Sequence, residues 1–465
     1  MKKTDVIIIG AGPAGIFTAY EVSKLCPDLK ILLLDKGKDI YNRSCPQQQF
    51  GLSKCAHCKR CSIMEGFGGA GAFSDGKYNI TTEFGGWLSE IVKDDKAVLE
   101  LIEYVDMVNV SFGAPNEYST SNDALDRLEA DAQKADLKVL RAKVKHIGTE
   151  VNLQVLKAMY EFLKEKVSVR MNTNVTKFIQ TEDGYIVYLE DGTMLESKYL
   201  VVAPGRRGAK WFADVCTNLS IPLLVNRVDV GVRVEVLASV CKKYTDEVYE
   251  VKVTSRENRH GDRVRTFCMN PNGVVALERV DDIITVNGHS YQDKALGTEN
   301  TNFALLVTNH FKSPFIDGYA YSRAIAKASN MLNGGVTVQR FEDLLRGKAT
   351  VEGFEKTNTV KPTLKAATPG DLEFIIPMRQ LEDIIDMLKQ LDKIMPGIAG
   401  PDTLLYGIEV KFYCSRPEMS EKLEIINYPN FFAPGDGSGT TRGLAQAAAA
   451  GVYVAREICQ REKNS

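Results

Sequence analysis

The residues with the clearest chemical spacing are three glycines close to the N-terminus. Gly10, Gly12 and Gly15 follow a buried apolar run at residues 6–9 and open a helical pattern, and Asp35 ends the next apolar run. In such a turn the first glycine permits the sharp bend, the second lets the backbone approach a pyrophosphate, and the third allows close helix packing. Asp35 would accept hydrogen bonds from ribose hydroxyls. The spacing predicts a dinucleotide site rather than an ordinary tight turn.

A second chemically active group is a set of four cysteines inside a long, irregular stretch at residues 36–78. Four thiolates this close together could ligate a 4Fe-4S cluster or a tetrahedral zinc ion. Two alternatives stay open, namely a pair of thiols that exchanges electrons with a cofactor and a set of unligated thiols. The four residues are Cys45, Cys55, Cys58 and Cys61.

Two further side chains are weaker candidates for catalysis. His289 stands in a polar Asn-Gly-His-Ser turn and could donate a proton, because imidazole titrates near neutral pH. Lys77 follows Asp75 in the glycine-rich loop and could neutralise negative charge on a reduced cofactor. A structural hydrogen bond for His289 and a solvated position for Lys77 are the alternatives.

The elements that must position these residues alternate between strands and helices. Residues 5–35 have the pattern strand, glycine turn, helix, strand, which predicts a βαβ unit. A hairpin at 185–195 leads to a strand at 199–203. Residues 88–101 and 151–165 have the apolar spacing of helices, and the last fifty residues return to a strand, a glycine loop and an Ala-rich helix.

The pattern changes in the middle of the chain, which indicates a second domain inserted into the first. Strands are expected at 228–236 and 264–268, and helices at 322–332 and 380–391. The predicted fold class is therefore α/β. A discontinuous Rossmann-type domain occupies 1–217 and 416–465, and an inserted α+β substrate domain occupies 218–415.

The composition of the chain limits the classes of partner and the cell compartment that can be expected. The chain has 465 residues, 44% of them hydrophobic and 25% charged, with a net charge of −2. There is no general positive field for nucleic acid or an anionic membrane, and no apolar run approaches the roughly 20 residues of a membrane span. The first residues imitate a secretory signal, but the glycines interrupt its apolar part. We expect a cytoplasmic protein whose ten cysteines are reduced.

Three motifs in this order carry a resemblance to a known class of proteins. With the glycine turn at 10–15, the segment 201–205 and the segment 433–437, the chain resembles the glutathione-reductase-type FAD flavoproteins. The resemblance implies that the first turn binds the FAD pyrophosphate and that the middle motif passes beneath the cofactor. It also implies that Asp436 contacts the ribityl chain and pyrophosphate. More narrowly, 66–77 and 437–444 look like an uncharacterised family of bacterial FAD-dependent dehydrogenases that has no assigned substrate.

The resemblance implies FAD contacts from all three motifs and from the loops beside them. The expected contact residues are Gly10, Gly12, Pro13, Ala14, Gly15, Asp35, Lys36, Gly37, Gly68, Gly69, Ala70, Ser74, Asp75, Gly76, Val175, Ala203, Pro204, Gly205, Gly435, Asp436, Arg442, Gly443 and Leu444.

The function expected from these features is an FAD-dependent oxidoreductase. It would relay a hydride between NAD(P)H or another donor, including an electron-donor protein, and a small organic substrate held by the inserted domain. No second glycine turn follows a strand at the same spacing, so NAD(P)H would bind transiently or in the inserted domain. Two other functions remain open. One is a tRNA-modifying flavoprotein, which the near-neutral charge does not favour, and the other is a non-catalytic flavin redox sensor.

Overall fold

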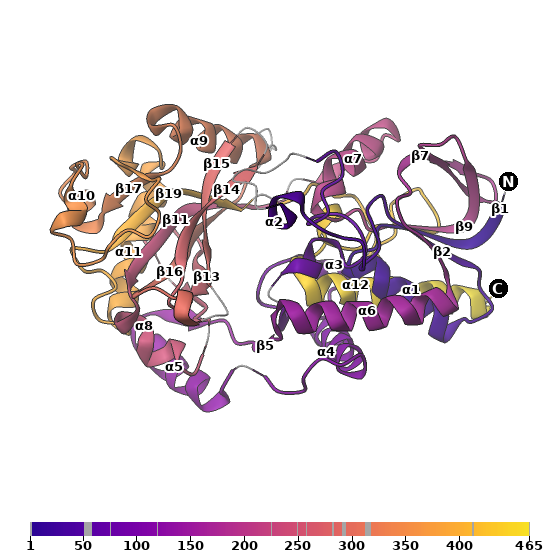
Figure 1. Cartoon of the computed structure of the whole chain (residues 1–465), viewed down its shortest axis with the longest axis horizontal. Coiled ribbons are helices and arrows are strands. Elements are labelled where there is room, and N and C mark those ends of the chain that lie inside the picture. Colours follow the sequence, from indigo (N-terminus) through magenta and orange to yellow (C-terminus); the bar gives the residue numbers. More distant parts are fainter. Residues whose placement is uncertain are drawn as a thin grey trace. The chain divides into compact units, whose positions relative to one another are not determined.

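The chain forms two compact units, each built from separate stretches of sequence (Figure 1). Unit 1 comprises Met1–Tyr118, Ala142–Asn226 and Cys414–Ser465, and unit 2 comprises Ser119–Arg141 and Arg227–Tyr413. The computed structural model describes residues 2–50, 58–74, 76–118, 120–224, 226–248, 250–256, 258–280, 283–290, 294–311, 318–411 and 413–464.

The centre of unit 1 is a seven-stranded sheet. Its order is β6 (Ser168–Arg170), β2 (Ile31–Leu34), β1 (Lys2–Ile9), β9 (Met194–Val202), β8 (Gly184–Leu189) and β7 (Val175–Thr181), with β21 (Phe431–Phe432) also paired to β9. The pairs among β6, β2, β1, β9 and β21 are parallel, and β7 and β8 extend the sheet with antiparallel pairs. All four residues of β2 are buried, which is typical of a parallel strand covered on both faces.

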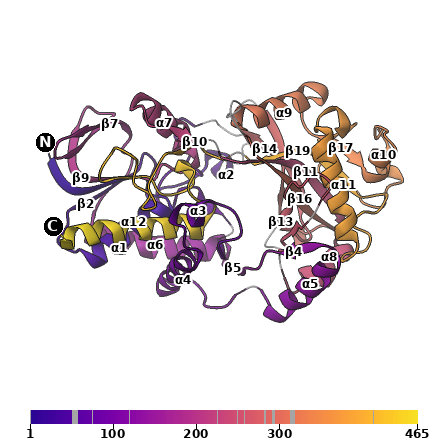
Figure 2. The ribbon, with the colours of Figure 1, turned by 180° about the vertical axis from the view of Figure 1, so that it is seen from behind.

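Two long helices lie side by side in unit 1, in both views (Figure 1 and Figure 2). They are α1 (Pro13–Leu25) and α12 (Leu444–Asn464). A Cβ added to Gly451 would lie 2.2 Å from the carbonyl oxygen of Ala14, and Thr18 Oγ1 donates a hydrogen bond of 3.2 Å to the Gly451 carbonyl. The two backbones therefore approach so closely that only glycine fits at position 451.

The remaining elements of unit 1 surround this sheet. The helices are α2 (Pro46–Gln49), α3 (Leu88–Val92), α4 (Asp95–Ser111), α6 (Gly148–Lys166) and α7 (Gly205–Asn218), with short 3-10 helices at Gly69–Phe73 and Asp436–Ser438. Two short antiparallel pairs complete the unit, β3 (Lys77–Ile80) with β5 (Lys143–His146) and β10 (Leu223–Leu224) with β20 (Arg416–Pro417).

Unit 2 is built on an eight-stranded sheet. Its order is β18 (Thr368–Pro369), β17 (Thr337–Arg340), β19 (Leu404–Lys411), β11 (Val228–Leu237), β16 (Asn300–Asn309), β13 (Val264–Asn270), β12 (Val253–Ser255) and β4 (Leu137–Val139). The β17–β18 pair is parallel, and the other pairs are antiparallel.

The other elements of unit 2 pack on this sheet or beside it. They are the hairpin β14 (Val274–Val280) and β15 (Ile283–His289), the helices α5 (Asn122–Lys134), α8 (Ala238–Thr245), α9 (Gly318–Asn333), α10 (Phe341–Leu345) and α11 (Met378–Asp392), and 3-10 helices at Lys294–Leu296, Phe354–Lys356 and Leu372–Phe374.

The two faces of the unit 2 sheet differ in chemistry. Along β11 the valines from Val228 to Val236 join the apolar cluster that also includes residues of α11. The residues between them, including Asp229, Arg233 and Glu235, are polar and are also buried. The hairpin β14–β15 packs on this second face, because a Cβ on Gly288 would lie 1.9 Å from a guanidinium nitrogen of Arg233. The charged face of the sheet is thus an interior surface.

The structure differs from the sequence expectation in two places. The helix expected over 88–101 is broken into α3 and α4, because Lys93 has a left-handed backbone and Asp94 caps α4 by accepting from the amide of Ala97 at 2.9 Å. The predicted boundaries at 218 and 415 also omit Ser119–Arg141, which belongs to unit 2 through α5 and β4. The second unit is therefore inserted in two pieces.

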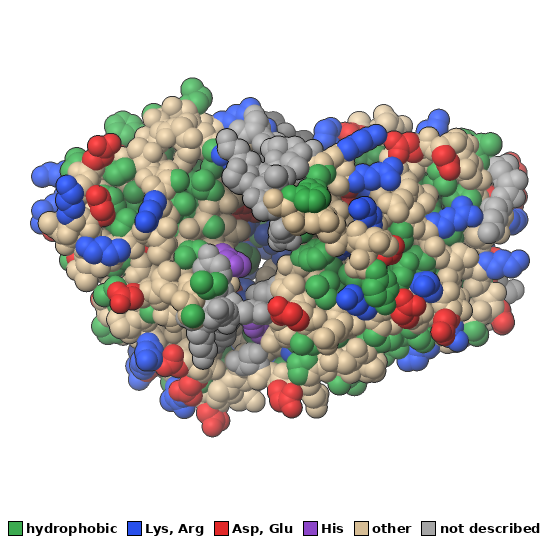
Figure 3. All heavy atoms as spheres, in the orientation of Figure 1, with side chains coloured by type: hydrophobic (Ala, Val, Ile, Leu, Met, Phe, Trp, Pro, Cys, Tyr) green, Lys and Arg blue, Asp and Glu red, His purple; other side chains and the backbone are tan. Residues whose placement is uncertain are grey.

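The charge on the surface and the length of the helices are relevant to the expected absence of nucleic-acid and membrane partners. On the face drawn in Figure 3, the described Lys and Arg side chains are interspersed with Asp and Glu side chains. None of the helices in the described part of the chain is long and apolar enough to cross a membrane.

Candidate functional site: a glycine-lined cavity in unit 1

A cavity of about 270 Å³ lies in unit 1, where three distant segments of the chain converge. Its wall is formed by the turn after β1, the segment after β9 and the loop before α12. The parallel strands β1 and β9 are direct neighbours, and β21 pairs with β9, so all three segments leave the same edge of the sheet. This edge, at the carboxyl ends of parallel strands, is where open α/β sheets bind ligands.

The glycines of the first turn have separate steric roles. A Cβ on Gly10, which has φ of 103°, would lie 2.1 Å from the carbonyl oxygen of Ala203, and a Cβ on Gly15 would lie 1.8 Å from the carbonyl oxygen of Gly10. A Cβ on Gly12 would meet only the Cα of Gly69, at 3.9 Å. Gly10 and Gly15 are therefore required by the fold, whereas Gly12 keeps the cavity wall free of a side chain.

The N-terminus of α1 is open to the cavity. Gly12 is the N-cap residue, and no side chain caps the helix there. Pro13 stands in the first turn, which contains no acidic residue. The free amides and the positive end of the helix dipole at such a terminus attract phosphate groups.

Asp35 joins two loops at the cavity. One carboxylate oxygen accepts from the amide of Ala11 at 2.8 Å and the other from the amide of Gly37 at 2.7 Å. Burial raises the pKa of Asp35 above its ordinary value, although both amides act in the opposite direction. Each oxygen has a second lone pair that could accept from a ribose hydroxyl. The structure thus gives Asp35 a role in shaping the turn in addition to the one expected for it.

Asp436 has a comparable position in the loop before α12. It accepts from the hydroxyl of Thr441 at 2.7 Å and from the amide of Gly443 at 3.3 Å. Burial raises its pKa above the ordinary value, against the positive charges of Arg206 and Arg442. A buried carboxyl on a cavity wall is suited to hydrogen-bond a ligand that carries hydroxyl groups.

Most of the expected contact residues meet at this cavity, and so does one of the two catalytic candidates. Gly15, Gly37, Gly68, Gly76, Val175 and Arg442 are not part of the wall, and Asp75 lies outside the described residues. The expected residues on the wall are Gly10, Gly12, Pro13, Ala14, Asp35, Lys36, Gly69, Ala70, Ser74, Lys77, Ala203, Pro204, Gly205, Gly435, Asp436, Gly443 and Leu444.

The wall also contains charged residues that the sequence did not single out. Glu65 is buried and pairs with Lys36 at 3.0 Å and with Arg207 at 3.4 Å. Arg206 and Arg207 open α7 directly after the Pro-Gly pair of the middle motif, a position that could have marked them. The wall residues that sequence reasoning missed are Met64, Glu65, Gly71, Arg206, Arg207, Pro434 and Ala447.

The other catalytic candidate, His289, lies elsewhere. It ends β15 in unit 2, is exposed, and pairs with Val274 across the hairpin. The structure therefore does not place it among the residues of the unit 1 cavity.

The cysteine cluster is described only in part. Cys45, Cys58 and Cys61 are free thiols, and Cys55 lies outside the described residues. In the part of the chain that the structure describes, no three His, Cys, Asp or Glu side chains are grouped as metal ligands would be. Buried Arg43 organises the nearby loop by donating to the carbonyls of Ser62 and Phe67. The metal site remains a prediction from spacing.

Comparisons with known proteins connect unit 2 and the whole chain to different relatives. Residues 228–412 match the family described as "FAD-dependent protein, C-terminal domain-like". That match lies within unit 2 and spans less than half of the chain. An uncharacterized protein of Clostridium beijerinckii is 26% identical over 480 residues, which cover 99% of this chain and 81% of the relative.

Solved structures with a similar course of the chain include two oxidases. The glycine oxidase of Geobacillus kaustophilus is 12% identical with a TM-score of 0.39, and the alignment covers 99% of this chain and 95% of that one. The L-alpha-glycerophosphate oxidase of Mycoplasma pneumoniae, solved with FAD bound, is 14% identical with a TM-score of 0.41 and the same coverage.

Proposed function

We propose that this protein is an FAD-dependent oxidoreductase that relays a hydride between NAD(P)H or another donor and a small organic substrate. The observation that carries the proposal is the convergence of three glycine-bearing segments, at residues 10–15, 203–205 and 435–443, on one cavity of unit 1. The match of residues 228–412 to an FAD-dependent family supports the choice of FAD among dinucleotides.

The donor set of the cavity fits this cofactor. The uncapped N-terminus of α1 would hold the pyrophosphate, and Gly12 leaves the space that its close approach needs. Asp35 and Asp436 offer buried carboxyl oxygens to hydroxyl groups. When bound, FAD supplies the hydride chemistry that no side chain provides. The residues of this chain bind and orient the cofactor.

Lys77 would contribute charge to the same site. It lies on the cavity wall at the start of β3, where its partner across the strand pair is His146. A cation in a partly enclosed site favours negative charge nearby far more than it would in water. We therefore assign Lys77 the role of stabilising negative charge that develops when the site accepts electrons.

The experiment is to purify the whole chain without oxygen, record its absorption spectrum, release the cofactor and identify it by chromatography. Flavin bands near stoichiometry, identified as FAD and bleached by NADH or NADPH, support the proposal. Protein that is colourless and gains no flavin on incubation with FAD overturns it. Bleaching without turnover of any added acceptor instead favours the redox sensor, and RNA that copurifies with the flavin favours the tRNA-modifying alternative.

A variant of Lys77 tests its role separately. Lys77→Met should still bind FAD, but the flavin reduction potential should fall, because the positive charge that favours the reduced state is gone. Lys157→Met, which removes a cation that lies over the ring of Tyr41, is the control and should leave the potential unchanged. An unchanged potential in Lys77→Met removes Lys77 from the site chemistry but not FAD from the cavity.

A further inference from the structure

Three buried cations surround one aromatic ring in unit 2. Lys252 Nζ, Arg265 Cζ and Lys411 Nζ lie 4.9, 5.2 and 5.9 Å from the ring centre of Phe267. The three charged residues are only 4%, 5% and 6% exposed, whereas the ring itself is half-buried. Buried cations are costly unless something compensates them. Phe267 is therefore a half-buried ring with three buried cations around it.

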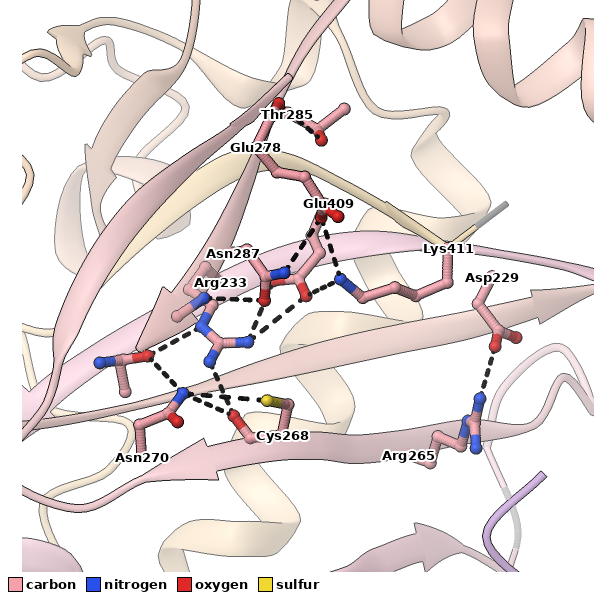
Figure 4. Close-up of polar contacts among 12 residues, drawn as sticks. Asp229, Arg233, Arg265, Cys268, Asn270, Glu278, Thr285, Asn287, Glu409 and Lys411 are labelled. Atoms are coloured by element: carbon pink, nitrogen blue, oxygen red, sulfur yellow. Dashed lines mark hydrogen bonds and ion pairs between the residues drawn. The ribbon is translucent and has the colours of Figure 1, made fainter. Parts of the chain in front are cut away.

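The strands of the sheet explain how these residues meet. Arg265 and Phe267 are two apart on β13 and so share one face of the sheet. Arg265 contacts Asp229 of β11, and Arg233 of β11 lies on the same polar face (Figure 4). In β16, which lies between β13 and β11, the residue opposite both Phe267 and Arg233 is Ala304. The side chain of β16 between Phe267 and Arg233 is thus only a methyl group.

Each buried cation on this face has a carboxylate partner, and Lys252 pairs with buried Glu250 at 3.3 Å. Arg265 pairs with Asp229 at 2.6 Å, but Glu409 is shared by two buried cations, Lys411 at 2.9 Å and Arg233 at 3.3 Å. The other partner of Lys411 is Glu278, at 3.6 Å, and its side chain is 36% exposed. Arg233 and Lys411 thus share one buried carboxylate, and the second carboxylate near Lys411 is partly exposed.

Arg265 also has an unused hydrogen-bond donor. Its Nη2 donates to Asp229 and to Tyr413, yet its buried Nε has no partner among the described residues. Arg233 is the contrast, because its Nε, Nη1 and Nη2 donate to Asn302, Glu409 and the carbonyl of Cys268. A buried donor without an acceptor destabilises the fold by its desolvation free energy, and a bound acceptor would offset that loss.

Burial acts to raise the pKa of Asp229, but Arg265 and the hydroxyl of Tyr413 hold that pKa below its ordinary value. Asp229 is therefore ionised, and Arg265 is half of a fixed charge pair. The pair orients the guanidinium and leaves Nε as the donor that remains for another group.

The backbone next to the ring is irregular. The register of β13 against β16 shifts between Phe267 and Asn270, and Cys268 within this bulge has φ of 47°. A bulge of this kind turns a side chain away from its regular direction and is common beside binding sites. The amide of Cys268 is held by Glu250 at 3.0 Å, so the bulge is fixed rather than loose.

We propose that this face of unit 2 binds an organic carboxylate, with the acid group at Arg265 and the cations beside it and the apolar body against Phe267. The carboxylate would accept from the free guanidinium donor of Arg265, and the ring would give the site its preference for an apolar or aromatic body. The proposal goes beyond the proposed function and does not depend on FAD.

The test is calorimetric titration of the whole protein with three probes. Phenylacetate has both features, phenylacetamide lacks the charge, and acetate lacks the apolar body. We expect phenylacetate to bind at least about tenfold more tightly than either of the others. Equal affinity for phenylacetate and phenylacetamide, or no binding of phenylacetate at all, overturns the proposal without affecting the cavity in unit 1.

Variants locate the site. Arg265→Lys keeps the charge but removes Nε and should weaken phenylacetate binding by about tenfold. Phe267→Leu should weaken phenylacetate while leaving acetate unchanged, and it serves if Arg265→Lys does not fold. Arg259→Lys, an exposed arginine of the same unit, is the matched control and should bind as the parent does. Unchanged phenylacetate affinity in folded Arg265→Lys or in Phe267→Leu places the binding elsewhere and overturns the proposal.

Discussion

Gly12 and Gly69 face one another at the wall of the unit 1 cavity, so closely that a Cβ on Gly69 would lie 3.1 Å from the Cα of Gly12. The turn after β1 and the 3-10 helix that begins at Gly69 thus approach each other closely at these two glycines. The contact leaves little room for a side chain at Gly69, but it leaves the cavity side of Gly12 open.

Gly12→Ala should therefore separate cofactor binding from folding. The added methyl group meets no atom of the chain closer than 3.9 Å, but it occupies space that a pyrophosphate needs. We expect a normal melting temperature for the apoprotein and FAD affinity lowered by about tenfold or more. Flavin fluorescence titration measures the affinity.

Gly10→Ala is the comparison, because its methyl group would lie 2.1 Å from the Ala203 carbonyl oxygen. It should reduce the yield of folded protein as well as flavin content. Full FAD affinity in Gly12→Ala would argue against the placement of a pyrophosphate at this turn.

A buried carboxyl in unit 2 should make stability depend on pH. Burial, together with the neighbouring carboxylate of Asp262, raises the pKa of Asp383 to about 6, against the opposing charges of His260 and Arg379. Because this pKa is higher than in the unfolded chain, the stabilising contribution is present below about pH 4 and is lost as pH rises through about 6. Asp383→Asn should raise the melting temperature by about 2 to 4 °C near pH 8 and change it little near pH 4.

Thermal melts of the parent and Asp383→Asn across this pH range give the answer. Asp386→Asn is the control. It removes a carboxylate three residues further along the same helix, α11. A difference between the parent and Asp383→Asn that does not vary with pH would show that Asp383 keeps its ordinary titration.

The ion pair between Lys145 and Asp106 in unit 1 should be costly to break from one side only. Its atoms are 2.8 Å apart, and the side chains are 1% and 6% exposed. Lys145→Met leaves Asp106 buried without its cation, so we expect a loss of about 3 to 5 kcal/mol in the free energy of unfolding. The double variant with Asp106→Leu should recover part of that loss in urea denaturation.

Lys96→Met is the surface counterpart, because the Lys96–Glu100 pair is exposed. Its effect should stay within about 0.5 kcal/mol. Equal effects of Lys96→Met and Lys145→Met would mean that burial does not set the strength of these pairs.

The hypothesis that the cysteines bind a metal can be tested by metal analysis. It requires stoichiometric iron with acid-labile sulfide, or stoichiometric zinc, in protein purified without oxygen. Cys61→Ser should then remove the metal, whereas Cys216→Ser, at a buried cysteine of α7, should not. Metal-free protein that contains FAD would leave the thiols to be tested for exchange with the flavin.

Much of unit 1 could be predicted because local patterns there also determine the long-range contacts. The buried runs of β1 and β2 and the glycines between them describe a βαβ unit whose geometry has few alternatives. The distant segments at 203–205 and 435–443 meet Gly10 because they too follow parallel strands of one sheet. The charged wall at Glu65 and Arg207 was missed, because pairing across the cavity depends on loop paths with no periodic signal.

Unit 2 was harder to predict for two physical reasons. The helix α5 is amphipathic, but its sequence does not indicate which of the two cores its apolar side joins. The alternation along β11 predicts a strand with one polar face, and such a face normally meets water. Here the hairpin β14–β15 covers Arg233 instead, a contact made possible by Gly288 in a distant strand.

The division of unit 1 into three stretches of sequence has a consequence for its synthesis. Both stretches of unit 2 are synthesised before Cys414, whereas β21 and α12 belong to the third stretch of unit 1, which follows them. Until then α1 lacks the helix that packs at Gly451, and the cavity lacks the wall that carries Asp436. A nascent chain can thus complete its second unit before the third stretch of the first unit is made, so the wall of the cavity is completed only after the second unit has been synthesised.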